Sequence, residues 1–170
     1  MQQGINRTQW CNILILVIVI LLLSNGVFYY IRHSSFLPNT AVRLYQKYAD
    51  ELQQVSEYLM NCSEDSVHLL YNGSDTLFQE QYSSLPVTSV AVNNPVIVQS
   101  CEMLKQVGVQ VIYKEKTNIY FQFFSNLDDG SGILFVAPQT TPPILDSSGI
   151  SIETIKIDSN FYYYRTILHK

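Results

Sequence analysis

The longest hydrophobic pattern in the chain is an unbroken aliphatic run over residues 13–23. After Ser24-Asn25-Gly26, apolar side chains resume and continue to Ile31, so residues 13–31 carry no charge. A helix of about 19 residues is roughly 28 Å long, close to the hydrocarbon core of a bilayer at about 30 Å. The pattern therefore predicts a transmembrane helix over residues 12–32, which follows a short tail over residues 1–11.

The polar interruption at residues 24–26 leaves two interpretations of this segment open. Small residues after a short apolar region are typical of a signal-peptidase site, so the segment could be a cleaved signal peptide. We favour an uncleaved signal anchor, because aromatic and cationic side chains suited to the membrane interface flank the span. The expected interface residues are Trp10, Tyr29, Tyr30 and Arg32.

A folded domain over residues 39–170 is expected after a connector over residues 33–38, in which Pro38 prevents one continuous helix from the membrane. Its first predicted helix has apolar residues spaced alternately by four and three. Because this spacing is a heptad, a coiled-coil dimerisation stalk is one interpretation. With fewer than three heptads, a helix that lays one face on a sheet is favoured. The stripe consists of Ala41, Tyr45, Tyr48, Leu52, Val55 and Leu59.

The middle of the domain mixes strand and helix signals. Residues 66–71 alternate as a strand does, and Ser74-Asp75 is predicted to cap a short helical piece that extends to about Tyr82. Residues 85–92 are predicted as a strand that Pro86 confines to a sheet edge or a loop. Asn94-Pro95 is a helix start, and Gly108 is a natural stop. Apolar positions cover most of this second helix, so we expect it to be largely buried.

From Val109 onward, the hydrophobic period changes from helical to two. Alternating and apolar runs separated by turn residues predict a succession of strands, and the almost wholly apolar run at 133–137 is expected at the sheet centre. The predicted fold is a small α+β domain, an antiparallel β-sheet meander with two main helices packed on it. The predicted strands cover residues 109–113, 120–124, 133–137, 150–157 and 161–168.

Charge restricts the location and the partners of the domain. All 14 acidic residues but only 8 of the 10 basic residues lie beyond residue 33, a net charge of about −6. Such a domain has no basic stripe for phosphates, which excludes nucleic acid as a partner. Arg7 and the amino terminus lie on one side of the span, and Arg32, Arg43 and Lys47 lie on the other. This count of positive charges favours a cytoplasmic domain. The scarcity of Lys and the short tail favour an extracytoplasmic domain, which is our expectation, and the opposite orientation stays open.

The sequence offers few groups for catalysis or metal binding. His33, His68 and His169 share no ligand spacing with one another or with a cysteine. Nucleophile elbows, Walker loops and zinc-protease motifs are absent from the sequence. Asp128-Asp129-Gly130 lacks the spacing of a calcium loop and is predicted to start a turn. We therefore expect no enzyme activity, no catalytic residue, no metal site and no cofactor.

Two cysteines, Cys62 and Cys101, lie in the expected domain. An even pair in an extracytoplasmic domain is a candidate disulfide. A buried free thiol at Cys101 is the alternative, because cysteine is among the most buried residue types. Both interpretations stay open.

The tyrosine-rich strand near the carboxyl terminus is a candidate interaction surface. Alternation places Phe161 and Tyr163 on one face, and Tyr162 and Tyr164 on the other. If the first pair is core, then Tyr162 and Tyr164 form an exposed patch beside Arg165, a composition typical of protein-binding hot spots. The alternative is that other elements cover both faces of the strand.

The last 40 or so residues combine a glycine before a short apolar strand, a Pro-rich loop and a closing hairpin with Phe-Tyr-Tyr-Tyr. This pattern resembles small single-span proteins of Gram-positive bacteria, and the resemblance implies no mechanism. We expect a membrane-anchored, single-pass, extracytoplasmic and non-catalytic protein that acts as an interaction or accessory module for a protein partner in the membrane or envelope. The alternative is a domain that binds a small ligand, or senses one, and signals through a partner membrane protein.

Overall fold

The computed structural model describes residues 17–20, 37–71, 77–82, 90–125, 130–143 and 150–168. The chain divides into two units, Met1–Leu37 and Pro38–Lys170, and each is described by itself. In the first unit, residues 17–20 are helical. Within the described ranges, no helix has the length and apolar character needed to cross a bilayer. The rest of the expected span lies outside these ranges, together with the expected interface residues Trp10, Tyr29, Tyr30 and Arg32.

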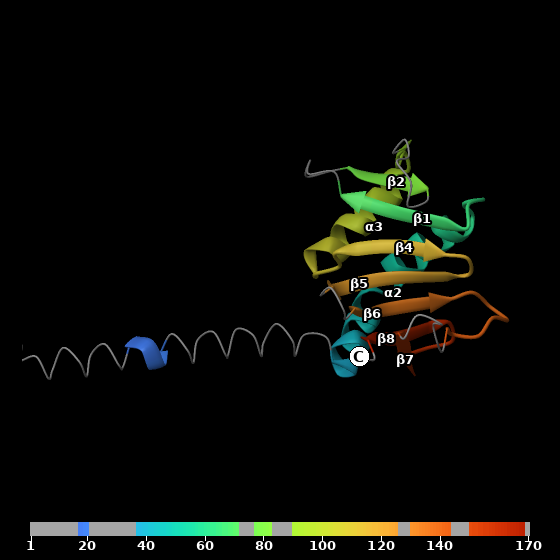
Figure 1. Cartoon of the computed structure of the whole chain (residues 1–170). Coiled ribbons are helices and arrows are strands. Elements are labelled where there is room, and N and C mark those ends of the chain that lie inside the picture. Colours follow the sequence, from blue (N-terminus) through green and yellow to red (C-terminus); the bar gives the residue numbers. More distant parts are fainter. Residues whose placement is uncertain are drawn as a thin grey trace, which may run out of the picture. The chain divides into compact units, whose positions relative to one another are not determined.

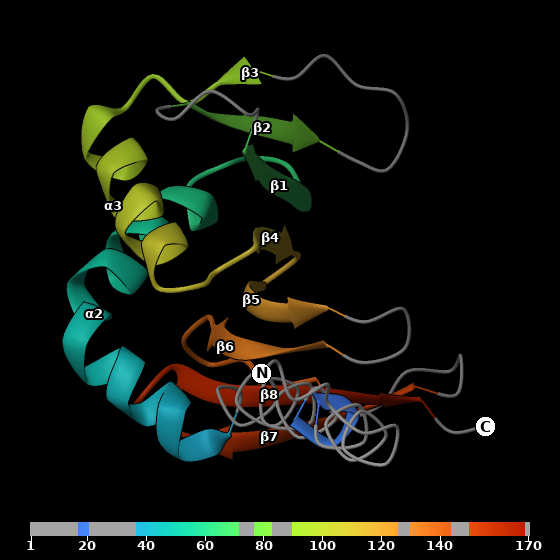
Figure 2. The ribbon, with the colours of Figure 1, turned by 90° about the vertical axis from the view of Figure 1, so that its left-hand side faces the viewer.

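The second unit is an antiparallel sheet of eight strands with helices α2 (Pro38–Met60) and α3 (Pro95–Gln106) on one face (Figures 1 and 2). An α+β fold built on an antiparallel sheet is therefore confirmed. The strands are β1 (Ser66–Tyr71), β2 (Phe78–Tyr82), β3 (Val90–Ala91), β4 (Val111–Glu115), β5 (Asn118–Ser125), β6 (Gly130–Val136), β7 (Ile150–Lys156) and β8 (Phe161–Leu168).

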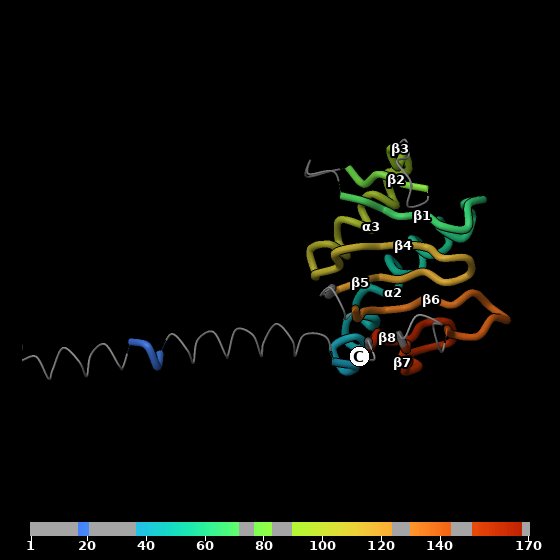
Figure 3. Tube along the Cα trace, in the orientation of Figure 1, coloured from blue at the N-terminus to red at the C-terminus, as the bar shows by residue number. Residues whose placement is uncertain are grey.

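The strand order is β3-β2-β1-β4-β5-β6-β8-β7, which departs from a simple meander twice. Helix α3 returns the chain from the edge strand β3 to β4, on the other side of β1 (Figure 3). After β6 the chain passes the position of β8 to form the opposite edge strand β7, and β8 then pairs with both β6 and β7.

Helix α2 begins at Pro38, which has the backbone angle that a first helical turn requires. Leu52, Val55 and Leu59 of the predicted stripe are buried, and the helix contacts α3, β6 and β8. This packing confirms the interpretation of the stripe as a surface laid on a sheet. The helix is kinked at Tyr48, whose φ of −127° and ψ of 29° are not helical.

The amino-terminal half of α2 is attached to the turn between β7 and β8. The Tyr45 hydroxyl donates a hydrogen bond to Asp158 Oδ2 over 2.5 Å, and the Tyr45 ring lies 5.0 Å from the Phe161 ring. Burial, followed by the hydrogen bond to Asp158 and the negative charge of Asp158, raises the pKa of Tyr45 to about 12. The same hydrogen bond is the main cause that lowers the pKa of Asp158 below its ordinary 3.8.

Tyr45→Phe is expected to destabilise the domain most between about pH 5 and 9, and less at both extremes. Below pH 3.8, Asp158 becomes protonated as the pH falls through its lowered pKa, so the wild type loses the stability that it has over Tyr45→Phe. Above pH 10, Tyr45 ionises as the pH rises through about 12, and the advantage is lost again. Denaturant midpoints measured across pH check this, with Tyr48→Phe as a control. A pH-independent difference between wild type and Tyr45→Phe would contradict the contact.

Helix α3 has the start and the stop that the sequence predicts. Asn94 Oδ1 accepts hydrogen bonds from the backbone N–H groups of Val96 at 3.0 Å and Ile97 at 3.4 Å, and Pro95 takes the first helical position. Gly108, at a φ of +104°, ends the helix with a hydrogen bond from its N–H to the Lys105 carbonyl. The expectation that α3 is largely buried is wrong, since only four of its twelve residues are buried and Val96 is 53% exposed. One side of α3 packs on the domain, and Val96 on the other side faces outward.

The predicted helical piece that ends near Tyr82 is also wrong, because residues 78–82 form strand β2. Phe78 and Glu80 point into the core, and the strand pairs with β1 along its whole length. Pairing with a neighbouring strand outweighs the local capping signal at Ser74-Asp75, which lies outside the described residues. Strand β3 is an edge strand, as Pro86 predicts, although only Val90–Ala91 is described as strand.

Strand β6 is buried at all seven residues and lies inside the sheet, which confirms the expected central strand, although it begins at Gly130 and not at Ile133. Opposite it, β5 has a β-bulge between Gln122 and Phe124. A second apolar cluster lies on the sheet face that neither α2 nor α3 covers. It comprises buried Tyr120, Leu134, Val136 and Tyr164, with Tyr113, Ile152 and Tyr162 packed against them.

Candidate functional site

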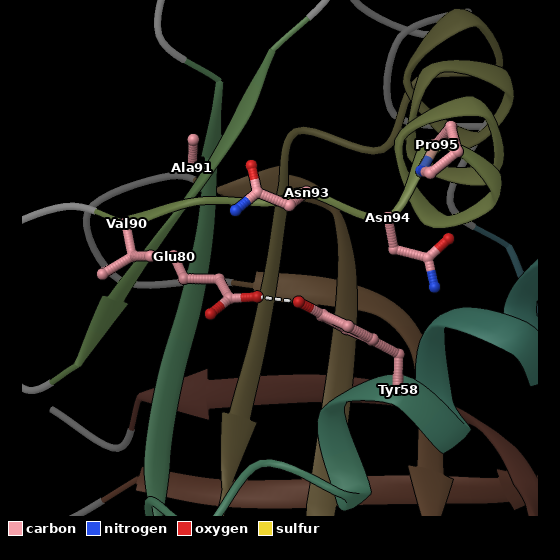
Figure 4. Close-up of a pocket in the computed structure, with 7 residues that line it drawn as sticks. All are labelled: Tyr58, Glu80, Val90, Ala91, Asn93, Asn94 and Pro95. Carbon is pink, nitrogen blue, oxygen red and sulfur yellow. Dashed lines mark hydrogen bonds between the residues drawn. The ribbon is translucent and has the colours of Figure 1, made fainter.

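A cavity of about 620 Å³ lies where the carboxyl-terminal half of α2 meets strands β2 and β3 and the start of α3 (Figure 4). We call it the Glu80 cleft. Val90 and Ala91 are exposed on the edge strand, so the cleft opens at the surface of the domain. Its lining residues are Tyr58, Glu80, Val90, Ala91, Asn93, Asn94 and Pro95.

Glu80 is a buried acid in this cleft, with only 4% of its surface exposed. The alternation of β2 turns Phe78 and Glu80 toward the helices, and Glu80 lies opposite Leu69 of β1. The Tyr58 hydroxyl donates to Glu80 Oε1, and the Tyr82 hydroxyl donates to Oε2. Figure 4 shows Tyr58 extending from α2 to meet the carboxylate. The acid is therefore fixed from both sides by phenols.

The two phenols are held in their protonated form. Burial is the main cause that raises the pKa of Tyr58, with the hydrogen bond to Glu80 and the charge of Glu80 as further causes. For Tyr82, the hydrogen bond to Glu80 is the largest cause of a raised pKa, and burial adds to it. Because each phenol donates to a different carboxylate oxygen, Glu80 acts as an acceptor at both oxygens.

A buried cation, Lys114, lies on the same face of the sheet, with strand β1 between it and Glu80. Its ammonium group donates to the Cys62 carbonyl over 2.7 Å. Burial raises the pKa of the Cys62 thiol, the charge of Glu80 raises it further, and Lys114 opposes that rise. Among the described side chains, no ion pair joins Lys114 to Glu80, because the ammonium is engaged at the end of α2.

The rim of the cleft combines amides with apolar surface. Asn93 and Asn94 are exposed, and Asn94 uses its side-chain oxygen to cap α3, which leaves its NH₂ group as a donor. Pro95 and Val90 supply the apolar part of the lining. The cleft thus offers one carboxylate, one phenol and two amides around an apolar wall. Such groups suit the binding of a ligand with N–H donors, whereas a phenol with a raised pKa is a poor nucleophile.

The three residues of the predicted interaction patch do not form an exposed patch. Tyr164 is 1% exposed, Tyr162 is half-buried, and Arg165 is exposed. The Tyr164 ring packs edge-on against Tyr120 at 5.2 Å, and Tyr120 stacks on Tyr113 at 4.6 Å. The expected exposure of Tyr164 is therefore wrong, because packing covers both faces of β8. Phe161 and Tyr163 are buried, as the alternation predicts.

Cys62 and Cys101 are free thiols in the structure, and Cys101 is fully buried. The candidate disulfide is not formed between these described residues. Burial raises the pKa of Cys101 to about 12, with the charge of Glu102 as a second cause. Cys101 is thus the buried thiol of the alternative interpretation. In the described part of the chain, no group of three His, Cys, Asp or Glu side chains is placed to hold a metal ion.

Sequence reasoning missed both Tyr58 and Glu80. Tyr58 follows the stripe residue Val55 by one turn but precedes Leu59, so it projects beside the buried stripe. The signal that could have identified Glu80 is its place two residues after Phe78, on the apolar side of an alternating segment. No protein-family model, curated protein or solved structure matches this chain.

Proposed function

We propose that this chain is a single-pass membrane protein whose extracytoplasmic domain is a non-catalytic interaction or accessory module, and that the module binds its partner in the Glu80 cleft. The observation that carries the proposal is a buried carboxylate, fixed by two phenols, beneath a cavity of about 620 Å³. A concave site in which a few polar groups converge is a usual form of a binding site.

The cost of burying an acid supports a binding role for the cleft. A buried carboxylate loses its hydration, and proteins compensate this loss with hydrogen bonds or an opposite charge. The hydroxyls of Tyr58 and Tyr82 provide two hydrogen bonds, and the nearby cation Lys114 is engaged by the Cys62 carbonyl. A ligand that enters the cleft can supply further compensation, so the site is prepared for binding before the ligand arrives.

The membrane part of the proposal rests on the sequence alone. Residues 12–32 have the length and the apolar character of a spanning helix, and the acidic domain is suited to an extracytoplasmic location. We expect the protein to resist carbonate extraction and to keep its amino terminus. A mature terminus at Val27 would instead identify residues 24–26 as a cleavage site.

A small-ligand or sensor domain is the second candidate function. The volume of the cleft is within the range of about 300 to 1,000 Å³ that is usual for small-molecule sites. We prefer a protein partner, because the exposed edge strand and the exposed Asn93 line the opening. A side chain of a partner can reach such a site from the surface without being enclosed.

Val90→Trp tests the proposal, because Val90 is exposed and lies opposite Glu80 in the pairing of β2 with β3. The two side chains therefore share one face of the sheet, and a large ring at position 90 fills the cleft. The control is Ile155→Trp, which adds a ring at an exposed position on the opposite edge strand β7. Tagged full-length protein is purified from membranes of its own host, and co-purified proteins are quantified. Val90→Trp is expected to lower the yield of a specific membrane partner by about tenfold, which corresponds to about 1.4 kcal/mol of binding free energy. Equal yields from the two variants would contradict a role for the cleft.

A further inference from the structure

We infer that the Glu80 cleft takes a cationic side chain, Lys or Arg, from the protein partner. This inference rests on the proposed function and assigns the chemistry of its ligand. It follows from three observations. Glu80, at the base of the cleft, accepts hydrogen bonds; apolar side chains and two side-chain amides form the rest of the lining; and the whole domain is acidic.

The Glu80 carboxylate can accept more hydrogen bonds than the two that it receives from the phenols. An ionised carboxylate has about four lone-pair positions, and the hydroxyls of Tyr58 and Tyr82 occupy one on each oxygen of Glu80. The remaining positions can accept N–H groups. A hydrogen bond with one ionised partner is roughly twice as strong as a neutral one. A cationic donor adds the attraction between opposite charges, so a cation gains most from binding to Glu80.

The walls suit a long side chain that carries a charge at its end. Lys and Arg have aliphatic stems that pack along apolar surface while the charged group reaches a polar partner. Val90 and Pro95 provide the apolar wall, and the amide oxygen of Asn93 provides a further acceptor at the rim. Among the described lining residues, Glu80 and Tyr58 are the ionisable ones, and neither carries a positive charge. No cationic side chain of this lining therefore competes with a ligand for Glu80.

The charge of the domain favours a basic partner. Beyond residue 33, the net charge is about −6, so a positively charged segment is attracted before contact. The exposed position of β3 places the opening where a partner's side chain can enter. We therefore assign the cation to the surface of a protein partner. A free amine is the alternative, and the experiment distinguishes these two sources.

The test uses the full-length chain in detergent micelles and two blocked amino acids, N-acetyl-lysine methylamide and its neutral counterpart, N-acetyl-norleucine methylamide. Binding is measured by titration, with the side-chain amide NMR signals of Asn93 and Asn94 as a local readout. We expect the lysine compound to bind at least about tenfold more tightly than the norleucine compound. Glu80→Gln is expected to remove this preference, whereas Glu153→Gln, the same change on the exposed strand β7, is expected to keep it within about twofold.

Thermal unfolding verifies that Glu80→Gln is folded. If it is not, Val90→Trp carries the test, because it leaves the carboxylate in place and should weaken binding of the lysine compound by about tenfold. Equal binding of both compounds, blocked by Val90→Trp, would overturn the cationic assignment and leave the cleft as a binding site. Tighter binding of free 1,5-diaminopentane than of the lysine compound would overturn the protein source. Binding of neither compound, with a partner yield that Val90→Trp does not change, would overturn the proposed function as well.

Discussion

Gly132→Ala is expected to lower the free energy of unfolding by about 3 kcal/mol or more, the largest effect of a methyl group added at any of the described glycines. A Cβ atom at Gly132 would lie 2.0 Å from the backbone oxygen of Phe121 and 3.0 Å from Cε1 of Tyr164. The first contact is with backbone inside the sheet, so a change of side-chain rotamer cannot relieve it. The strand itself must shift.

The packing around Gly132 explains why a residue without a side chain occupies this position. Gly132 pairs with Tyr164 on one side and with Gln122 on the other, next to the bulge between Gln122 and Phe124. The bulge brings the neighbouring backbone close, and the Tyr164 ring occupies the space beside the glycine. The buried second cluster of the sheet depends on this close approach.

Gly108→Ala is the matched control, because it adds the same methyl group where there is room. The nearest atom to its added Cβ is Cδ1 of Phe123 at 3.9 Å, and the strain comes from the φ of +104° alone. That left-handed conformation costs about 1 kcal/mol for alanine. Chemical denaturation of the full-length protein measures both changes. If Gly132→Ala cost no more than Gly108→Ala, the close contact of β5 and β6 would be wrong.

Glu80→Ala is expected to destabilise the domain by about 2 to 4 kcal/mol, because it leaves two phenol hydroxyls without their acceptor and creates a void beneath the cleft. It also removes a negative charge on the same sheet face as the buried Lys114, with β1 between the two residues. Glu153→Ala, at an exposed position on β7, is the control and should change stability by less than about 0.5 kcal/mol.

A double-mutant cycle with Tyr58→Phe isolates the hydrogen bond between α2 and β2. Tyr58→Phe alone is expected to cost about 1 kcal/mol, and the double variant should cost about 1 kcal/mol less than the sum of the two single changes. The shortfall measures the coupling between the phenol and the carboxylate. Purely additive effects would show that Tyr58 does not fix Glu80, and the cleft would lose its prepared geometry.

The elements that the sequence predicts well are those with a local cause. Asn94-Pro95 specifies the start of α3, because the capping oxygen and the proline ring act within one turn. Residues 133–137 are apolar on both faces, which requires a strand that is covered on both sides. The hairpin of β7 and β8 follows from alternation around the turn that contains Asp158. In each case, neighbouring residues decide the structure.

The elements that the sequence does not predict are decided by distant contacts. Strand β2 has a mostly polar sequence, and its pairing with β1 is what makes it a strand. Tyr164 is covered because Tyr120 and Gly132 of other strands accommodate its ring. The candidate site shows the same limit, because α2, β2, β3 and the start of α3 each contribute to it. No short motif joins Tyr58 to Glu80, and only the tertiary fold places them together.

The most direct test of the central claim, that the Glu80 cleft binds a protein partner at the membrane, is photocrosslinking in intact cells of the native host. A benzophenone side chain is placed at Asn93, on the rim of the cleft, or at Ile155, on the opposite edge strand. Our account predicts a crosslink from position 93 to one membrane or envelope protein, its loss in Glu80→Gln, and no such crosslink from position 155. The same product from both positions, or crosslinks from position 93 that Glu80→Gln leaves unchanged, would contradict it.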